Sequence, residues 1–375
     1  MNFDFSDDLK LLGEQARKFL RERNSVGAAR RVIDGAEPYD HSLWREMGEM
    51  GWIGAAIPEE YGGAGLGHLG LCVLAEELGY ALAPVPFSSS VYLASEAILL
   101  AGSAAQKERY LPKLASGEMI GTMALAEGPL VLDPAKFVTS VAKGKISGTK
   151  EPVADAVAAH LAIVAAKSGD RALSLFIVDL TGPGVARERV ETIDPSRAHG
   201  RIALNGAAAE LLGAPGEGEA LLQRLFDRAA VLFAFEQVGG AQAALDMAKG
   251  YALERYAFGR PIGSFQAIKH KLVDVYVATE LARSNAYYGA WALSKDAPEL
   301  PVAAAAARVA ASDAFYLAAK ENIQTHGGMG FTWAFDCHLY YRRAKLLSLA
   351  VGSTRQWKDR LVAMLETRNI SAAES

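Results

Sequence analysis

Apolar residues recur at helical spacing over the first 120 residues of the chain. Between Phe5 and Arg23 they mark one buried face of a helix, at Leu9, Leu12, Ala16 and Leu20. The same periodicity predicts further helices over His41–Met50, Leu69–Leu82, Ser88–Leu100 and Ala104–Leu114. The glycine-rich segment PEEYGGAGLG, residues 58–67, is predicted to be a loop between two of them.

The pattern changes near Gly121 to short β-favouring runs separated by turn residues. The runs are Thr122–Ala126, Phe137–Ala142, Leu161–Ala166, Leu173–Val178, Gly184–Val190 and Arg201–Leu204. Strands at this spacing, without helices between them, favour a small antiparallel sandwich or barrel. Long helical stretches then return, over 221–256, 264–295, 299–327 and 335–367. We therefore predict an α+β chain with an N-terminal helical domain (1–120), a central antiparallel β domain (121–218) and a C-terminal four-helix bundle (219–375).

Composition narrows the class of protein. A chain of 375 residues can build two or three cores, and a net charge of −4 provides no basic surface for nucleic acid. No apolar run reaches the roughly 18 residues of a membrane span. The acidic start MNFDFSDDLK is unlike a signal peptide. Cys72 and Cys337 fit neither a disulfide framework nor a metal site, so we expect two separate thiols in a reducing cytoplasm and no metal.

One candidate site lies in the block RYAFGRPIGSFQAIKHKLVD, residues 255–274. Arg255 and Arg260 flank a tight Gly/Pro turn between two predicted helices, where charge-assisted hydrogen bonds and backbone donors can hold a diphosphate. Gln266 opens the next helix, and its amide can reach a phosphate or an adenine edge. Taken alone, the block is explained more simply as a capped helix–turn–helix with surface arginines.

A second candidate site is the segment QTHGGMGF, residues 324–331. A predicted helix stops there at a run of glycines, which would let the backbone approach a ligand closely. Glycine-rich helix ends are also common C-caps, so this segment does not establish a site by itself.

Together, the loop PEEYGGAGLG and the blocks RYAFGRPIGSFQAIKHKLVD and QTHGGMGFTWAFDCHLYYRRAK resemble the acyl-CoA dehydrogenase family, in this order and over essentially the whole chain. The resemblance implies a flavoprotein that uses FAD in α,β-dehydrogenation of an acyl-CoA thioester, passes electrons to an electron-transfer flavoprotein, and assembles as a dimer of dimers. It also implies that these C-terminal blocks reach the FAD of a neighbouring subunit. Arg255 would meet the pyrophosphate with Phe258 and Gln266 close by, and the adenosine end would be lined by Gln324, Gly327 and Gly328.

The catalytic base expected from the resemblance is missing. Removing a proton α to a thioester needs a carboxylate, and the family places it before a Gly-Thr pair near the C-terminus or on the first long C-terminal helix. The matching positions hold Val351 and Ala229. Neither side chain can accept a proton, so the catalytic residue is left unknown.

The flavin-ring contacts of the β domain depart from the family pattern as well. The expected Thr-Glu-Pro run reads Ala126-Glu127-Gly128-Pro129-Leu130-Val131, and the expected Trp-Ile-Thr reads Pro152-Val153-Ala154. The usual Arg-Asp pair late in the chain is Arg342-Arg343. The losses fall on the flavin-ring and substrate half of the site, whereas the residues directed at a neighbour's FAD remain.

Three functions are compatible with this split. The favoured one is a subunit of a heteromeric acyl-CoA dehydrogenase, similar to those acting on steroid-type CoA thioesters, which contributes the cross-interface FAD half-site. The second is a self-sufficient homo-oligomeric enzyme with an unrecognised base, for which Glu127, Glu236 and Asp336 are the candidates. The third is a non-enzymatic scaffold that binds CoA thioesters.

Nearby ionisable residues are given structural roles. Glu236 lies in the apolar stretch AAVLFAFEQVGG, where a buried charge needs a partner, and we favour structural pairing over catalysis. His270 and His326 adjoin the two blocks and are read as surface or packing residues.

Overall fold

The computed structural model describes residues 5–128, 136–168 and 172–373. Segments that are distant in sequence combine into two compact units. Unit 1 consists of Met1–Gly27, His68–Ala83 and Ala230–Ser375, and unit 2 consists of Ala28–Gly67 and Pro84–Ala229. Two N-terminal helical segments thus belong with the C-terminal helices. The division into three domains at residues 120 and 218 stays a prediction.

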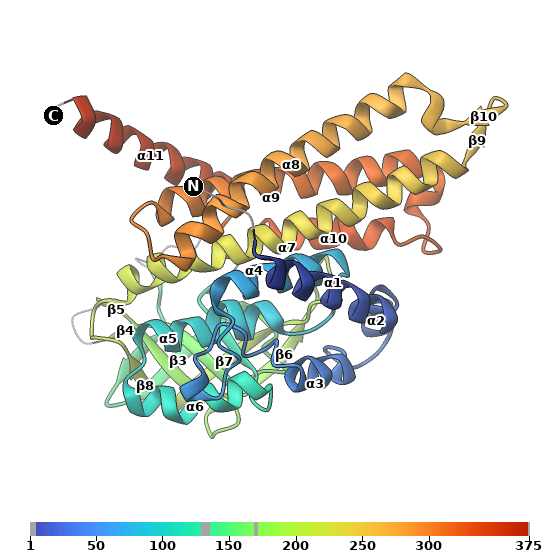
Figure 1. Cartoon of the computed structure of the whole chain (residues 1–375). Helices are drawn as coiled ribbons and strands as arrows, with labels where there is room; N and C mark the ends of the chain where they lie inside the picture. The colour runs from blue at the N-terminus through green and yellow to red at the C-terminus, as the bar shows by residue number, and fades with distance from the viewer. Residues whose placement is uncertain (1–4, 129–135, 169–171, 374–375) are drawn as a thin grey trace. The chain divides into compact units, whose positions relative to one another are not determined.

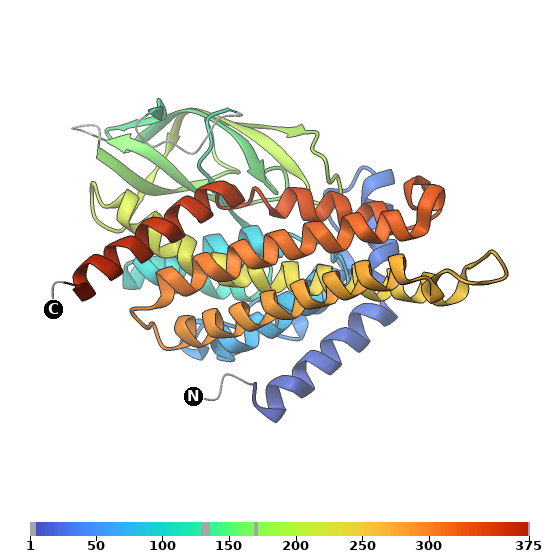
Figure 2. The ribbon, with the colours of Figure 1, turned by 90° about the horizontal axis from the view of Figure 1, so that it is seen from above.

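Unit 1 is helical (Figures 1 and 2). In both views α7, α8 and α9 run side by side. Its helices are α1 (Asp7–Glu22), α4 (Gly67–Tyr80), most of α7 (Gly218–Glu254), α8 (Gln266–Ser294), α9 (Leu300–His326), α10 (Cys337–Leu347) and α11 (Thr354–Ala373). A hairpin of β9 (Tyr256–Ala257) and β10 (Arg260–Pro261) joins α7 to α8, followed by the short turn η4 (Ile262–Ser264). A second short turn, η5 (Gly327–Phe331), follows α9.

Two glycines bring α4 and α7 unusually close together. A Cβ added at Gly79 would overlap the backbone of Glu236, and one at Gly239 would overlap the backbone of Glu76. Glycine costs stability inside a helix, so its presence at both contact points reflects the close approach of the two backbones. The segment of α7 from residue 230 to 238 is buried all round, which places the side chain of Glu236 in the core of the unit.

The helix predicted over 335–367 is two helices, α10 and α11, with a turn at 348–353. Val351 and Gly352 adopt positive φ angles of 51° and 107°, which an α-helix does not allow. Ser353 and Gln356 then form a capping box, because the Gln356 side chain accepts from Ser353 N at 2.9 Å and Ser353 Oγ accepts from Gln356 N at 3.3 Å. Apolar residues continue at helical spacing across this turn, so the hydrophobic pattern alone did not predict it.

Unit 2 combines helices with one eight-stranded sheet. Its helical elements are most of α2 (Ser25–Asp34), α3 (His41–Glu49), the short turn η1 (Glu59–Tyr61), the π-helix η2 (Ser88–Ser95), α5 (Glu96–Ala101) and α6 (Ala104–Ser116). Its strands are β1 (Gly121–Ala124), β2 (Ser140–Ala142), β3 (Lys145–Ala154), β4 (Leu161–Ser168), β5 (Ala172–Asp179), β6 (Val185–Val190), β7 (His199–Ala208) and β8 (Glu210–Leu212). They follow the order β6-β7-β3-β2-β4-β5-β8, with β1 also paired to β4.

The predicted fold class is confirmed, and its sheet is mixed rather than purely antiparallel. β1 and β2 both pair with β4 in parallel, whereas the other neighbours in the sheet are antiparallel. β4 is buried from Leu161 to Ala166, and its Leu161 and Ile163 belong to a core that also includes Leu111 and Leu114 of α6. α2 and β3 were not predicted, since the first is short and polar and the second contains Gly148 and Pro152.

α9 is the one helix of the described residues that is long and apolar enough to cross a membrane by length and composition. Of its most apolar window, 61% is buried inside the structure. Arg308 is fully buried within the same helix. Its apolar character is therefore explained by packing between other helices.

Candidate functional site: one end of the helical unit

The first candidate block forms a tight hairpin at the end of α7. Phe258 and Gly259 occupy its turn with φ angles of 52° and 78°, as a type I′ turn requires. A positive φ is rare for a bulky residue such as Phe258, and strained residues of this kind cluster at functional sites. The Phe258 side chain is 96% exposed and meets the Phe265 ring edge-on at 6.2 Å. The turn therefore holds an aromatic ring out in solvent, where a ligand or a second chain could cover it.

The second candidate block lies at the same end of unit 1. His326, near the end of α9, stacks on Tyr251 of α7 with ring centroids 4.1 Å apart, and its Nδ1 lies 2.9 Å from Asn322 O. This contact fastens the end of α9 to the end of α7 (Figures 1 and 2). His326 is thus a packing residue, as predicted, and His270 lies exposed on α8.

The predicted cofactor-binding residues all face solvent at this end of the unit. They are Arg255, Phe258, Gln266, Gln324, Gly327 and Gly328. A Cβ added at Gly327 or Gly328 would meet nothing within 4 Å, so the backbone there is open to a ligand. Gln266 begins the 29-residue helix α8, whose positive end favours an anion.

These groups suit the nucleotide half of a dinucleotide cofactor. A guanidinium and a helix N-terminus can hold a pyrophosphate, two amides can bond an adenine edge or a ribose, and the glycines leave room for the sugar. The same two segments also carry exposed aromatic side chains, Phe258 and Phe331, the second of which is 82% exposed.

Neither position expected for a catalytic base carries an acid. Ala229 is fully buried in α7, and Val351 lies in the turn between α10 and α11. Arg308 holds that turn in place: it donates hydrogen bonds to Leu347 O and, at 2.8 Å, to Ala350 O. The residues from 346 to 356 include no acid.

Glu236 is paired, as the sequence favoured. Arg343 Nη1 lies 3.8 Å from Glu236 Oε1, and each side chain is 1% exposed. Arg308, which is also fully buried, is attracted by the same carboxylate, although its own burial holds the pKa of Arg308 below the usual value. One carboxylate thus neutralises part of the charge of two buried arginines. The sequence did not identify either arginine as a partner of Glu236, because 72 or more residues separate them from it along the chain.

Glu127 is likewise held in an ion pair, within unit 2. Lys150 Nζ donates to Glu127 Oε1 at 2.7 Å, and the backbone N–H groups of Val138 and Thr139 donate to the same carboxylate at 2.6 and 3.1 Å. Burial alone would raise the pKa of Glu127, but these hydrogen bonds outweigh it and lower the pKa. The Glu127 carboxylate is therefore already bonded within unit 2. Of the run around it, Pro129, Leu130 and Val131 lie outside the described residues.

We expect Lys150 to make the free energy of unfolding depend on pH. Burial lowers the pKa of Lys150 to about 8 from 10.5, against the attraction of Glu127. Between about pH 8 and pH 10.5 the Lys150 side chain is protonated in the unfolded chain and largely neutral in the folded one. The unfolded chain therefore binds more protons than the folded chain, and the free energy of unfolding rises with pH by at most about 1.4 kcal/mol per pH unit. Lys150→Met should remove this slope, as measured by urea unfolding at several pH values. Lys145→Met, an exposed lysine on the same strand, should keep it; equal slopes in all three proteins would contradict the assignment.

Comparison with known proteins agrees with this architecture. The model of the acyl-CoA dehydrogenase N-terminal domain matches residues 6–118, and that of the C-terminal domain matches residues 216–363. The chain belongs to the acyl-CoA dehydrogenase family, which confirms the resemblance seen in its motifs. It is therefore an oxidoreductase of the FAD-dependent class that acts on acyl-CoA thioesters, and FAD is its cofactor.

Individual relatives extend over nearly the whole chain. The acyl-CoA dehydrogenase IpdE2 of Mycobacterium tuberculosis is 36% identical over 360 residues, covering 95% of this chain and 96% of that protein. A variant of the Tcur3481–Tcur3483 steroid ACAD superposes with a TM-score of 0.87 at 32% identity, over 98% of this chain and 99% of that one. The ChsE4–ChsE5 complex of Mycobacterium tuberculosis gives a TM-score of 0.88 at 27% identity, over 98% and 99% of the two chains.

Proposed function

We propose that this chain is the supporting subunit of a heteromeric acyl-CoA dehydrogenase, in which a second chain of the family supplies the catalytic base. The proposal is carried by a contrast within the molecule. The end of unit 1 presents open, unobstructed groups for the nucleotide half of FAD, whereas both base positions hold aliphatic side chains, Val351 and Ala229. Of the alternative acids, Glu127 and Glu236 are held in buried or half-buried ion pairs, and Asp336 lies at the start of α10.

The division of labour follows from these groups. FAD, when bound, accepts the hydride that leaves the β-carbon of the acyl chain. Arg255 and the start of α8 would hold the pyrophosphate, and Gln324 with Gly327 and Gly328 would line the adenosine. The α-proton would be taken by a carboxylate of the partner chain, since no side chain at either base position here can take it.

The comparisons support a heteromer and a large, steroid-type acyl group. Two of the similar structures are described as a steroid ACAD named for two chains, Tcur3481–Tcur3483, and as the ChsE4–ChsE5 complex. We also infer an assembly of four chains, a cytoplasmic location and an electron-transfer flavoprotein as electron acceptor, as the family resemblance implies.

Flavin content per chain tests the proposal. The chain should be colourless when purified alone. Its complex with a co-expressed second chain of the family should contain about one flavin per unlike pair, as measured by visible absorbance and protein concentration. A yellow homo-oligomer with one flavin per chain and dehydrogenase activity would overturn it. Absence of flavin in every complex would instead leave a scaffold that binds CoA thioesters.

A further inference from the structure

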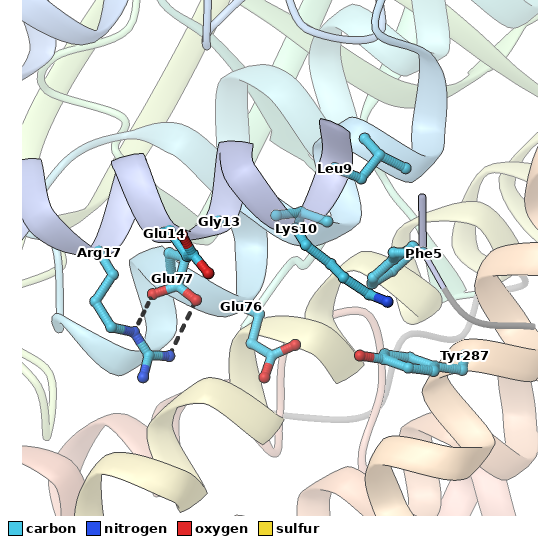
Figure 3. Close-up of a pocket in the computed structure, with 10 residues that line it drawn as sticks. Phe5, Leu9, Lys10, Gly13, Glu14, Arg17, Glu76, Glu77 and Tyr287 are labelled. Carbon is cyan, nitrogen blue, oxygen red and sulfur yellow. Dashed lines mark hydrogen bonds and ion pairs between the residues drawn. The ribbon is translucent and has the colours of Figure 1, made fainter. Parts of the chain in front are cut away.

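Two cavities lie along α1 within unit 1, on either side of one ion pair. Arg17 Nε lies 2.6 Å from Glu77 Oε2 and Arg17 Nη2 lies 3.0 Å from Glu77 Oε1, so the pair is bidentate. Figure 3 shows this pair and the first cavity. The Arg17 guanidinium also lies 3.9 Å over the Tyr80 ring, which fixes its position between the two cavities.

The first cavity, of about 270 Å³, is not suited to an anion. Three carboxylates line it, from Glu14, Glu76 and Glu77, against two cations, Lys10 and Arg17. In the view of Figure 3, Glu76 is drawn between Glu77 and Tyr287. Arg283, outside the lining, pairs with Glu76 and offsets the third carboxylate. The cavity therefore offers an anion no excess of positive charge.

The second cavity, of about 240 Å³, has the opposite balance. Arg17 and Arg21, one turn apart on α1, line it, and Glu77 is the one acid among its lining residues. The other residues that line it are Leu20, Asn24, Ser25, Val26, Tyr80, Ala81 and Tyr340. Two guanidinium groups against one carboxylate leave a single positive charge. The aliphatic side chains and the Tyr340 ring add an apolar wall.

Ser25 is the feature of this cavity that internal packing does not explain. It is 2% exposed, and its hydroxyl has no hydrogen-bond partner among the residues that the structure describes. It begins the ten-residue helix α2, but the helix is already capped, because Asn24 Oδ1 accepts a hydrogen bond from Gly27 N at 3.3 Å. A buried hydroxyl without a partner destabilises the fold unless something else supplies its hydrogen bond.

We propose that this second cavity binds a small monocarboxylate with an apolar body. Its carboxylate would accept hydrogen bonds from Arg21 and the Ser25 hydroxyl near the positive end of α2, and its apolar part would lie against Leu20 and Val26. A single negative charge matches the single excess positive charge. The volume is sufficient, because an engineered apolar cavity of about 150 Å³ already takes benzene.

Benzoate binding to the purified chain, followed by calorimetry at low ionic strength, tests the site. We expect one benzoate per chain, and Arg21→Met should weaken binding at least about tenfold through loss of a charge-assisted hydrogen bond. Arg23→Met is the matched control, because Arg23 lies two residues further on and does not line the cavity. No saturable binding, or an equal loss in both variants, would overturn the proposal, as would tighter binding of inorganic phosphate than of benzoate.

Ser25→Ala provides a second test, which distinguishes a ligand-binding role of the hydroxyl from a purely structural one. Removal of an unpartnered hydroxyl should leave the stability of the protein unchanged or raise it, while weakening benzoate binding several-fold. Lower stability with unchanged benzoate affinity would overturn the role of Ser25 as a ligand donor. None of the lining residues belongs to the predicted flavin site, so benzoate binding to the purified chain does not depend on the heteromer. The same titration on the flavin-loaded complex should give the same affinity. Failure of this site and failure of the proposed heteromer can therefore be told apart.

Discussion

Arg255→Met should lower the affinity of the assembled enzyme for FAD by at least about tenfold, because it removes a charge-assisted hydrogen bond to a pyrophosphate. Arg255 is exposed beside the hairpin at the end of α7, so its loss leaves no cavity in the core of unit 1. The measurement is titration of the flavin-free complex with FAD, followed by flavin fluorescence.

The matched control for this variant is Arg224→Met. Arg224 is an exposed arginine near the other end of the same helix, far along the chain from the two cofactor blocks. It should bind FAD like the unmodified complex. If Arg255→Met retains full affinity while the complex is intact, the nucleotide half-site is not at this end of the unit.

Glu236→Leu should destabilise the protein by about 3–5 kcal/mol, the range for breaking a buried ion pair from one side. The variant leaves two buried arginines, Arg308 and Arg343, without the carboxylate that attracts them. Chemical denaturation of the purified chain, followed by circular dichroism, measures the change in the free energy of unfolding.

A double variant separates the ion pair from simple packing. Glu236→Leu combined with Arg343→Met removes both charges of the Glu236–Arg343 pair, and part of the lost stability should return. Arg308 still loses the attraction of the carboxylate but keeps its hydrogen bonds to Leu347 O and Ala350 O. A catalytic role predicts a different result: Glu236→Gln would then abolish turnover and leave the unfolding free energy nearly unchanged. A stable but inactive Glu236→Gln complex would therefore reverse our assignment of Glu236.

Local patterns in the sequence located most of the helices and strands. The helix over 5–23 and the runs that became β4 and β5 carry a strong periodicity or a continuous apolar run, which local sterics and burial translate directly into structure. The turn at 348–353 was missed because apolar residues continue across it at helical spacing. The Ser353–Gln356 capping box is visible in the sequence and could have indicated the start of a new helix.

Long-range pairing was not visible in the sequence. Lys150 meets Glu127 across 23 residues and Arg343 meets Glu236 across more than 100, and no local pattern indicates which charge a buried carboxylate will find. The parallel pairing of β1 and β2 with β4 was missed for the same reason. Strand order depends on how distant segments pack, whereas alternation along a strand reports only that it is half-buried.

The sequence by itself determined the family and the cofactor, because these depend on residue types at short, recognisable spacings such as 255–266 and 324–328. That the catalytic base is missing stays a prediction from the same motifs. Only the tertiary structure decided that both blocks lie exposed at one end of a helical unit. It also decided that two of the three alternative candidates for the base, Glu127 and Glu236, are held in ion pairs. It alone revealed the cavity between α1 and the start of α2. Exposure, charge pairing and cavities are properties of the packed chain, since they depend on which distant side chains exclude water from each other.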